Sequence, residues 1–464
     1  MIEGLLLRDV EVEGRRVDVR VRDGVVTAMG PAAALAGEPG EGVIDGGGGA
    51  LIPGLHDHHI HLFATAALER SVRCGPPHVR TPDDLARALR GAPGDGWVRG
   101  VGYHERVAGD LDRHALDAIV ADRPVRVQHR SGAQWVLSSA ACTAVGLDTG
   151  PVPDGAELDH DGRPTGRLRR LDRWLRDRMP PEPPPDVAAL SRRLAHLGVT
   201  GVTDATPVEA ADDLAALAGA GVVQQLQVTG GPALADAAFP TGVTRGPVKV
   251  VLGDHDLPAY DDVVAWFRRA HGAGRPVAVH CVTRVALVLA VAVWAEVGVR
   301  HGDRVEHASV TPIELLATLA ELGVTVVTQP GFVVERGDDY LADVDAADRD
   351  DLYRCASLLD AGIPVGGSTD APYTDPDPWR AMVAAVERTT GAGVVLGPHE
   401  AVAPRRALDL FLAPLDDPGG PPRTIHAGAP ADLVLLATPL EHALRDLDAG
   451  AVVTTIIDGR SIEP

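Results

Sequence analysis

Residues 53–62 read PGLHDHHIHL, with four histidines and one aspartate inside six consecutive positions. An apolar strand-like segment leads into this stretch. In a β-strand, alternate side chains point to the same face. His59 and His61 therefore share one face with Asp57, and the remaining two histidines share the other. Two imidazoles one residue apart on one face of a rigid strand can hold one metal ion, so the stretch predicts the beginning of a metal site.

The other residues of this stretch are expected to support the site rather than to bind metal. Asp57 lies on the inward face but lower than the two histidines, which favours a hydrogen-bonding role. His56 and His58 are expected to point toward a layer of helices, where a structural role is favoured.

Length and composition limit the class of protein. The chain has 464 residues, 45% of them hydrophobic and 23% charged, as in globular proteins with a sizeable core. Its net charge of -22 argues against nucleic acid and anionic membranes as partners. The four cysteines are scattered without a C-x-x-C pair, which predicts free thiols in a reducing compartment. With no signal-peptide pattern and no apolar run long enough to span a bilayer, we expect a cytoplasmic protein.

Through the middle of the chain, short apolar strands alternate with helical segments, a pattern typical of a parallel α/β fold. Several of the helical segments end in glycine, as helices commonly do. Eight strands are expected, at 51–62, 199–205, 222–230, 248–254, 276–282, 304–310, 324–330 and 363–370. Eight strands, each followed by a helix, predict a (β/α)8 barrel of the TIM type.

The two ends of the chain differ from the middle. Polar and apolar residues alternate over the first fifty residues, which predicts short antiparallel strands, and the last forty are also strand-like. We expect 1–50 and 425–464 to pair into one small β-sandwich domain beside a barrel domain over 51–424. Residues 63–185 separate the first two barrel strands and predict an inserted subdomain over the barrel mouth.

In a barrel of this kind, the working side chains lie at the carboxyl ends of the strands. Residue types that bind metal stand there on five predicted strands: His59, His61, Lys249, His280, His307 and Asp370. A single histidine beside a strand is more often a satisfied polar residue, but an ordered set of this size is improbable by chance. The sequence contains 43 lysine and arginine residues in total, and Lys249 is the only lysine. Its place in this set favours a function that arginine cannot perform.

With these residues in place, the chain resembles the amidohydrolase superfamily over nearly its whole length. The matching features are the PG-x-x-D-x-H-x-H block at 53–61, the strand-end residues above, and the segments GAPADLVLL (428–436) and TTIIDGR (454–460). The insertion, the R-x-E-H element at 304–307 and the S-x-D-A-P element at 368–372 resemble the branch that contains N-substituted formamide deformylases. H-x-H alone is weak evidence, whereas the ordered set across the strands is specific.

The resemblance implies a centre for divalent metal, with Zn²⁺ as the expected ion. Its implied ligands form two groups: His59, His61 and Asp370 for one ion, and His280 and His307 for a second. A carbamate formed from carbon dioxide on Lys249 would bridge the two ions, which arginine cannot do. If Lys249 is not carboxylated, one ion could be held by His59, His61, His280 and Asp370, with His307 outside the ligand set.

The resemblance also implies an activity. A metal-activated hydroxide would cleave a C–N bond in a small molecule, in an amide, a cyclic amide or an N-formyl group. Asp370 would be catalytic, taking the proton of the attacking water and returning it to the leaving group. A mononuclear deaminase and a non-catalytic barrel that binds metal or a small molecule are the alternatives. A small-molecule substrate is the expected partner, and a homodimer is left open.

Substrate contacts are expected near the barrel mouth. Gln329 and Tyr373 stand at the ends of the seventh and eighth strands, and His104 lies in the insertion, where a structural role is also open. Glu306 is adjacent to an implied ligand, so strand alternation predicts that it points away from the site. After His280 the chain reads CVTR where the deformylase-like branch often has A-I-G-D, which predicts a different loop near the substrate.

Overall fold

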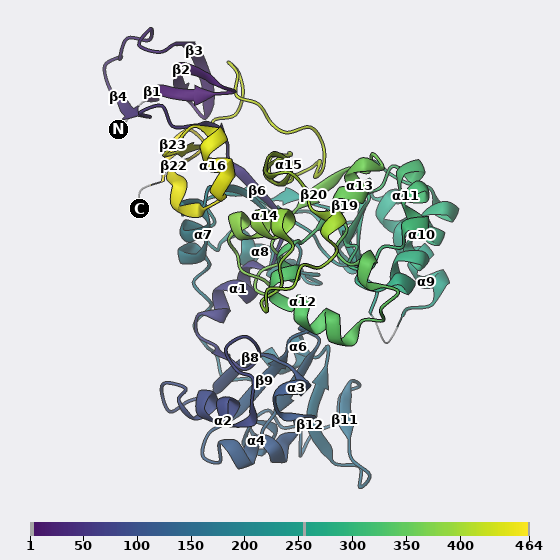
Figure 1. The fold of residues 1–464 in the computed structure, drawn as a ribbon. Coiled ribbons are helices and arrows are strands. Elements are labelled where there is room, and N and C mark those ends of the chain that lie inside the picture. Colours follow the sequence, from purple (N-terminus) through teal and green to yellow (C-terminus); the bar gives the residue numbers. More distant parts are fainter. Residues whose placement is uncertain (1–3, 254–256, 463–464) are drawn as a thin grey trace. The chain divides into compact units, whose positions relative to one another are not determined.

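The computed structural model describes residues 4–253 and 257–462. These residues divide into two compact units (Figure 1). One unit contains the chain up to Leu62 and again from Val187 onward, and the other is Phe63–Asp186. The last position of the predicted fourth strand, residue 254, lies outside the described residues.

Parallel strands form two sheets in the first unit, in the orders β15-β14-β13-β6 and β16-β17-β18-β19-β20. Every neighbouring pair in these sheets is parallel. The strands are β6 (Leu55–Ile60), β13 (Val199–Asp204), β14 (Gln225–Val228), β15 (Thr244–Arg245), β16 (Val248–Val251), β17 (Val277–Cys281), β18 (Arg304–His307), β19 (Thr325–Thr328) and β20 (Val365–Gly367). Each of the eight strands predicted from the sequence contains one or more of these segments.

Backbone hydrogen bonds connect the two sheets at both edges. The amide of Lys249 on β16 donates to the carbonyl of Gly230, just after β14, at 2.8 Å. At the other edge, the amide of Asp370, just after β20, donates to the carbonyl of His59 on β6, also at 2.8 Å. The carboxyl ends of strands far apart in the sequence are therefore brought together.

Helices follow most of these strands: α7 (Val187–His196), α8 (Ala211–Ala218), α9 (Tyr260–Gly272), α10 (Arg284–Val297), α11 (Leu316–Leu322), α12 (Gly331–Asp343), α13 (Ala356–Asp360), α14 (Pro378–Glu387) and α15 (Pro404–Asp409). The apolar strand residues Val250, Val279 and Val305 pack with Phe267 of α9 and Trp294 of α10 in one core. Strand alternation then turns the intervening polar residues to the opposite face. Within 4–253 and 257–462, no helix has the length and apolar character needed to cross a membrane.

The predicted first strand is divided into two. β5 (Leu51–Pro53) pairs with β21 (Leu433–Leu436) in the terminal β-domain, and β6 begins after Gly54. A Cβ atom at Gly54 would lie 2.1 Å from the side chain of Thr200, so only glycine fits where the backbone passes from one sheet to the next.

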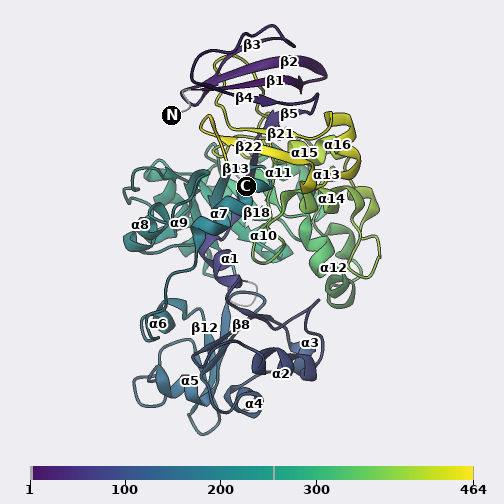
Figure 2. The same ribbon diagram turned by 90° about the vertical axis from the view of Figure 1, so that its left-hand side faces the viewer.

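Within the first unit, strands from the two ends of the chain form two further sheets with the orders β3-β2-β1-β4 and β23-β22-β21-β5 (Figure 2). Residues from both ends, among them Leu7, Val19, Leu433 and Ile456, form one apolar core. β4 pairs with β1 in parallel, unlike the antiparallel arrangement expected. The remaining elements are β1 (Gly4–Val12), β2 (Arg15–Arg22), β3 (Val25–Pro31), β4 (Glu41–Asp45), α16 (Leu440–Asp446), β22 (Val452–Ile457) and β23 (Arg460–Ser461).

The second unit is built on one sheet of the order β11-β12-β10-β9-β8-β7. Its strands are β7 (Val72–Arg73), β8 (Val98–Tyr103), β9 (Val125–His129), β10 (Gln134–Leu137), β11 (Ala156–Leu158) and β12 (Pro164–Arg169). Its helices are α2 (Pro82–Arg90), α3 (Glu105–Ala108), α4 (Arg113–Ile119), α5 (Ser139–Ala144) and α6 (Asp172–Arg176), and α1 (Leu62–Leu68) leads into it. Two apolar clusters, one around Leu89 and Val127 and one around Trp135 and Leu168, form its core.

Candidate metal centre

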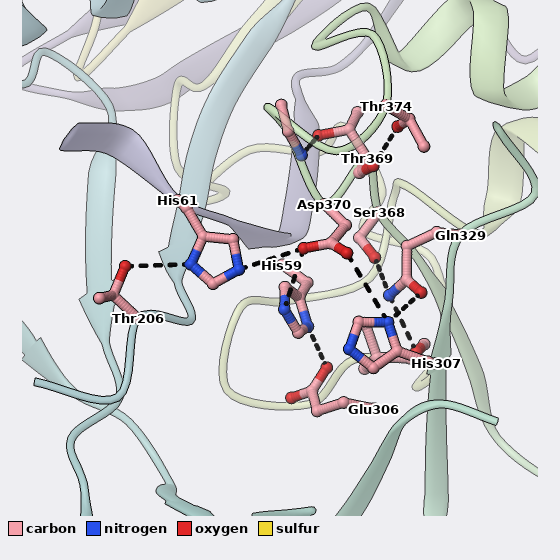
Figure 3. Close-up of polar contacts among 12 residues, drawn as sticks. His59, His61, Thr206, Glu306, His307, Gln329, Ser368, Thr369, Asp370 and Thr374 are labelled. Atoms are coloured by element: carbon pink, nitrogen blue, oxygen red, sulfur yellow. Dashed lines mark hydrogen bonds and ion pairs between the residues drawn. The ribbon is translucent and has the colours of Figure 1, made fainter. Parts of the chain in front are cut away.

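Three of the residues proposed as ligands form a compact cluster. One donor atom from each of His59, His61 and Asp370 lies within 4.8 Å of the others. Oδ1 of Asp370 is 3.1 Å from Nε2 of His61 and 3.4 Å from Nε2 of His59. Figure 3 shows both imidazoles directed at this carboxylate.

The other three proposed ligands, His280, His307 and Lys249, lie beside this cluster. Nδ1 of His307 is 3.8 Å from Oδ2 of Asp370, and the His307 ring centroid is 4.9 Å from that of His59. The rings of His280 and His307 are 4.5 Å apart, centroid to centroid. Nζ of Lys249 is 3.4 Å from Nε2 of His59. All six predicted side chains therefore meet at one place.

Two of the imidazoles have a defined proton position. Nδ1 of His59 lies 2.5 Å from Oε2 of Glu306, and Nδ1 of His307 lies 2.7 Å from Oε1 of Gln329. The amide nitrogen of Gln329 donates to Oγ of Ser368 at 2.9 Å, which leaves its oxygen to accept. Because a carboxylate and an amide oxygen only accept, both Nδ1 atoms carry the proton and both Nε2 atoms carry a lone pair. A lone pair on Nε2 is what a metal ion requires.

His61 also has a partner at Nδ1, the hydroxyl of Thr206, at 3.0 Å. Thr206 follows β13 by two residues, and its role was not predicted. Its position just beyond a strand end was the available signal, but the sequence alone does not show which strand-end hydroxyl meets which imidazole. Only the parallel pairing of β6 with β13 brings the two together.

The surroundings of Asp370 fit a divalent cation. Its Oδ1 is buried and has no hydrogen-bond donor of suitable geometry in the described part of the chain. A buried carboxylate oxygen without a partner is costly. The nitrogen lone pair of His59 faces the same oxygen, which is unfavourable unless a cation lies between them. Imidazole nitrogen and carboxylate oxygen are the ligands that zinc and similar ions share.

Burial sets the protonation states at the centre. It lowers the pKa of His59 to about 3, and it lowers the pKa values of His280 and His307 as well. It also lowers the pKa of Lys249, in part against the attraction of nearby carboxylates. Neutral imidazoles and an ionised carboxylate are the forms that bind metal.

Glu306 lies at the centre, so the prediction that it points away is wrong. The backbone of His307 has φ of 73°, in the left-handed region, and strand alternation therefore ends at Glu306. Glu306 and His307 can then both face the site. Arg304, two residues earlier on the same face, donates from Nε to Oε1 of Glu306 at 2.7 Å.

Asp57 accepts hydrogen bonds from neighbouring residues, which is the role that the sequence predicted for it. Its Oδ2 accepts from the hydroxyl of Thr369 at 2.5 Å, and its Oδ1 accepts from the amides of Thr369 and His59 at 3.1 and 3.2 Å. Burial raises the pKa of Asp57 to about 7. Thr369 precedes Asp370, whose φ is 56°, so Asp57 anchors a strained segment that carries a proposed ligand.

His56 and His58 lie outside the ligand cluster formed by the described residues. Nδ1 of His56 is 2.8 Å from the carbonyl oxygen of Ala413. His58 is fully buried, and this burial lowers its pKa to about 3. Strand parity thus separates the four imidazoles as expected.

The three predicted substrate contacts have different surroundings. The Tyr373 ring lies 5.6 Å from that of His61, centroid to centroid, and it is partly exposed. Gln329 is fully buried, with its amide engaged by His307 and Ser368. His104 belongs to the second unit, where its Nδ1 accepts from the amide of Arg106 at 3.4 Å. Their roles toward substrate stay predictions.

Comparisons with known proteins identify the family of the chain. The model of the amidohydrolase family matches residues 42–462, and the chain belongs to that family. It is 27% identical to the N-substituted formamide deformylase of Arthrobacter pascens, over 95% of this chain and 94% of that protein. The resemblance to the amidohydrolase superfamily and its deformylase-like branch is therefore confirmed.

Solved structures resemble the fold. An uncharacterized metal-dependent hydrolase from Pyrococcus furiosus aligns with a TM-score of 0.70 and 22% identity, over 93% of this chain and 98% of that one. The 5-methylcytosine deaminase of Klebsiella pneumoniae aligns with a TM-score of 0.57 and 16% identity, over 99% and 98% of the two chains. At these identities the likeness concerns the fold alone. The family and these neighbours imply a TIM barrel with an additional domain.

Proposed function

We propose that this protein is a metal-dependent hydrolase that cleaves an amide, cyclic amide or N-formyl C–N bond in a small molecule. The observation that carries the proposal is the cluster of His59, His61 and Asp370. Their donor atoms lie within 4.8 Å of one another, and a buried carboxylate oxygen of Asp370 accepts no hydrogen bond of suitable geometry from the described residues. Membership of the amidohydrolase family supports the reaction class. The deformylase of Arthrobacter pascens makes N-substituted formamides the first substrates to test.

We infer that the two parallel sheets are parts of one closed (β/α)8 barrel. The hydrogen bonds of Lys249 with Gly230 and of Asp370 with His59 support this closure. The proposed site then lies at the carboxyl ends of the strands, where barrel enzymes carry their active sites.

Two groups of residues would hold metal. His59, His61 and Asp370 would bind one divalent ion, with Zn²⁺ as the expected metal, and His280 and His307 would bind a second. A carbamate on Lys249 would join the two sites; the buried amine beside His59 and the absence of any other lysine in the sequence support this assignment. When bound, ions of this kind lower the pKa of water and polarise a carbonyl group.

The remaining chemistry belongs to the side chains of the chain itself. The ionised carboxylate of Asp370 would accept a proton from water and return it to the departing nitrogen. His59 and His307 are held with Nε2 free of a proton by their partners Glu306 and Gln329. Tyr373, partly exposed beside His61, would contact the substrate next to the reacting bond.

Bound metal and substrate turnover test the proposal together. The purified protein, reconstituted with Zn²⁺, is analysed for metal by plasma mass spectrometry and assayed with N-substituted formamides, cyclic amides and aminopyrimidines. We expect at least one ion per chain and release of formate or opening of a cyclic amide. A protein that binds no divalent metal would refute the proposal.

The same panel separates the alternatives. Ammonia release from an aminopyrimidine, without amide cleavage, would identify a deaminase; the fold shared with the deaminase from Klebsiella pneumoniae is the observation behind this second candidate. Bound metal without turnover of any substrate would instead indicate a binding protein.

A further inference from the structure

Three buried side chains at the centre, Arg304, Glu306 and His59, are connected in series by polar contacts. Metal binding by His59 does not by itself account for the other two. Nε of Arg304 donates to Oε1 of Glu306 at 2.7 Å, and Oε2 of the same carboxylate lies 2.5 Å from Nδ1 of His59. Figure 3 shows Glu306 meeting the ring of His59 on the side away from Asp370. These contacts join the first and third positions of the R-x-E-H element on β18, Arg304 and Glu306, to a histidine on β6.

All three side chains are removed from solvent. Their relative exposures are 1% for Arg304, 0% for Glu306 and 1% for His59. Arginine stays protonated at any ordinary pH, so Glu306 remains paired with a fixed positive charge. A second nitrogen of Arg304 lies 3.4 Å from the carbonyl oxygen of His58, which ties the guanidinium to the strand that carries His59.

We propose that Glu306 is a positioning residue that orients His59 for metal binding, and that Arg304 holds Glu306 in place. The inference rests on the proposed function in one respect, that His59 is a ligand. The carboxylate keeps the proton of His59 on Nδ1 and fixes the ring plane. It also makes the lone pair of Nε2 a stronger ligand for metal. Partners of this kind typically change metal affinity by about 10- to 100-fold.

Glu306 differs from the other partners of the cluster in its charge. His61 and His307 meet a neutral hydroxyl and a neutral amide at Nδ1, on Thr206 and Gln329. Among these three contacts, only the one to His59 comes from a carboxylate, and a charge-assisted hydrogen bond is about twice as strong as a neutral one. Loss of Glu306 should therefore weaken metal binding more than loss of either neutral partner.

The test measures Zn²⁺ affinity by competition with a chromophoric chelator. In E306Q one acceptor oxygen must serve two donors, Arg304 and His59, and we expect Zn²⁺ to bind at least about 10-fold more weakly than to wild type. E400Q is the matched control. Glu400 is also fully buried and paired with an arginine, Arg354 at 2.5 Å, but it has no contact with the proposed ligands. Its variant should keep wild-type affinity.

A double variant separates positioning from charge neutralisation. R304M/E306M removes both buried charges, so a role limited to neutralising Arg304 predicts recovery of wild-type affinity. Positioning predicts that affinity stays at least about 10-fold weaker, because His59 still lacks its acceptor. This variant also decides the matter if E306Q does not fold. Wild-type affinity in E306Q or in the double variant would overturn the inference, whereas a wild type without bound Zn²⁺ would overturn the proposed function itself.

Discussion

Oδ1 of Asp370 lies 3.1 Å from Nε2 of His61, although Asp370 follows β20 and His61 follows β6. The amide of His61 also donates to the carbonyl of Ala371 at 2.9 Å, so backbone and side chain join the same two segments. Nε2 of His59 is 3.4 Å from the same oxygen, so a carboxylate and two imidazoles surround one point.

Replacing Asp370 by asparagine should lower both metal affinity and turnover. Asparagine has a similar shape but lacks the negative charge and cannot accept a proton from water. We expect turnover to fall by about 10²- to 10⁴-fold, with less Zn²⁺ bound per chain. D360N, at an exposed aspartate paired with Arg406, is the control and should resemble wild type. Full turnover in D370N would contradict the catalytic role.

Replacing Lys249 by alanine should lower the metal content from two ions to one or none. Without the amine no carbamate can form, and the two proposed sites lose their shared ligand. Metal is counted by mass spectrometry, and turnover is measured with and without added short carboxylic acids, which should restore part of it. If K249A keeps the metal content and the rate of wild type, the bridging role is wrong.

Removing metal should lower thermal stability. A ligand that binds only the folded state stabilises it by mass action, so dialysis against a chelator should lower Tm, and restored Zn²⁺ should raise it again. The measurement is a pair of melting curves at constant pH. An unchanged Tm, in a sample shown to have lost its metal, would argue against an ordered metal centre.

Replacing His58 by leucine should make the metal-free protein less sensitive to acid. The pKa of His58 is about 3 in the folded protein, whereas unfolded histidine titrates near 6.5. Between these values only the unfolded chain takes up the proton, so stability is full above pH 6.5 and falls as the pH decreases. The slope is up to about 1.4 kcal/mol per pH unit for one group.

Urea unfolding at pH 7.5 and 5.5 measures this effect. We expect H58L to lose less free energy of unfolding than wild type between the two pH values. Asp57, with a pKa raised to about 7, acts in the opposite direction and is common to both proteins. H442Q, at an exposed histidine, serves as control. An equal loss in wild type and H58L would contradict the burial of a neutral imidazole.

Replacing Tyr373 by alanine should raise KM more than it lowers kcat. The ring is partly exposed beside His61, and Tyr373 is not one of the proposed metal ligands. Its removal should therefore weaken substrate binding while the metal content stays constant. We expect KM to rise by about 10-fold, close to the loss of one buried side-chain contact. Y260A, on the surface of α9, is the control. A lower metal content in Y373A would point to a structural role instead.

Local patterns in the sequence predicted much of the fold. Strand parity separated His59 and His61 from His56 and His58, although the pairing of β6 with β13 shifts register within this segment. Asp370 follows β20 and Lys249 lies within β16, and the sequence predicted both residues in the same cluster. These inferences depend only on the two-residue period of a strand and on the common edge of parallel strands.

Two features could not be predicted from local pattern. The first strand is divided at Gly54, where the Thr200 side chain leaves no room for a Cβ atom, and that neighbour comes from a distant segment. Glu306 faces the centre because His307 adopts a left-handed backbone conformation, which ends the alternation used to predict its direction.

The sequence by itself determined which residues are proposed as ligands, the alternation of strands and helices, and the family. Only the tertiary structure decided which partner holds each imidazole: Glu306 for His59, Thr206 for His61 and Gln329 for His307. The reason is physical. Spacing along one strand defines which side chains share a face, whereas hydrogen bonds between strands depend on register and on local backbone angles, which distant packing sets.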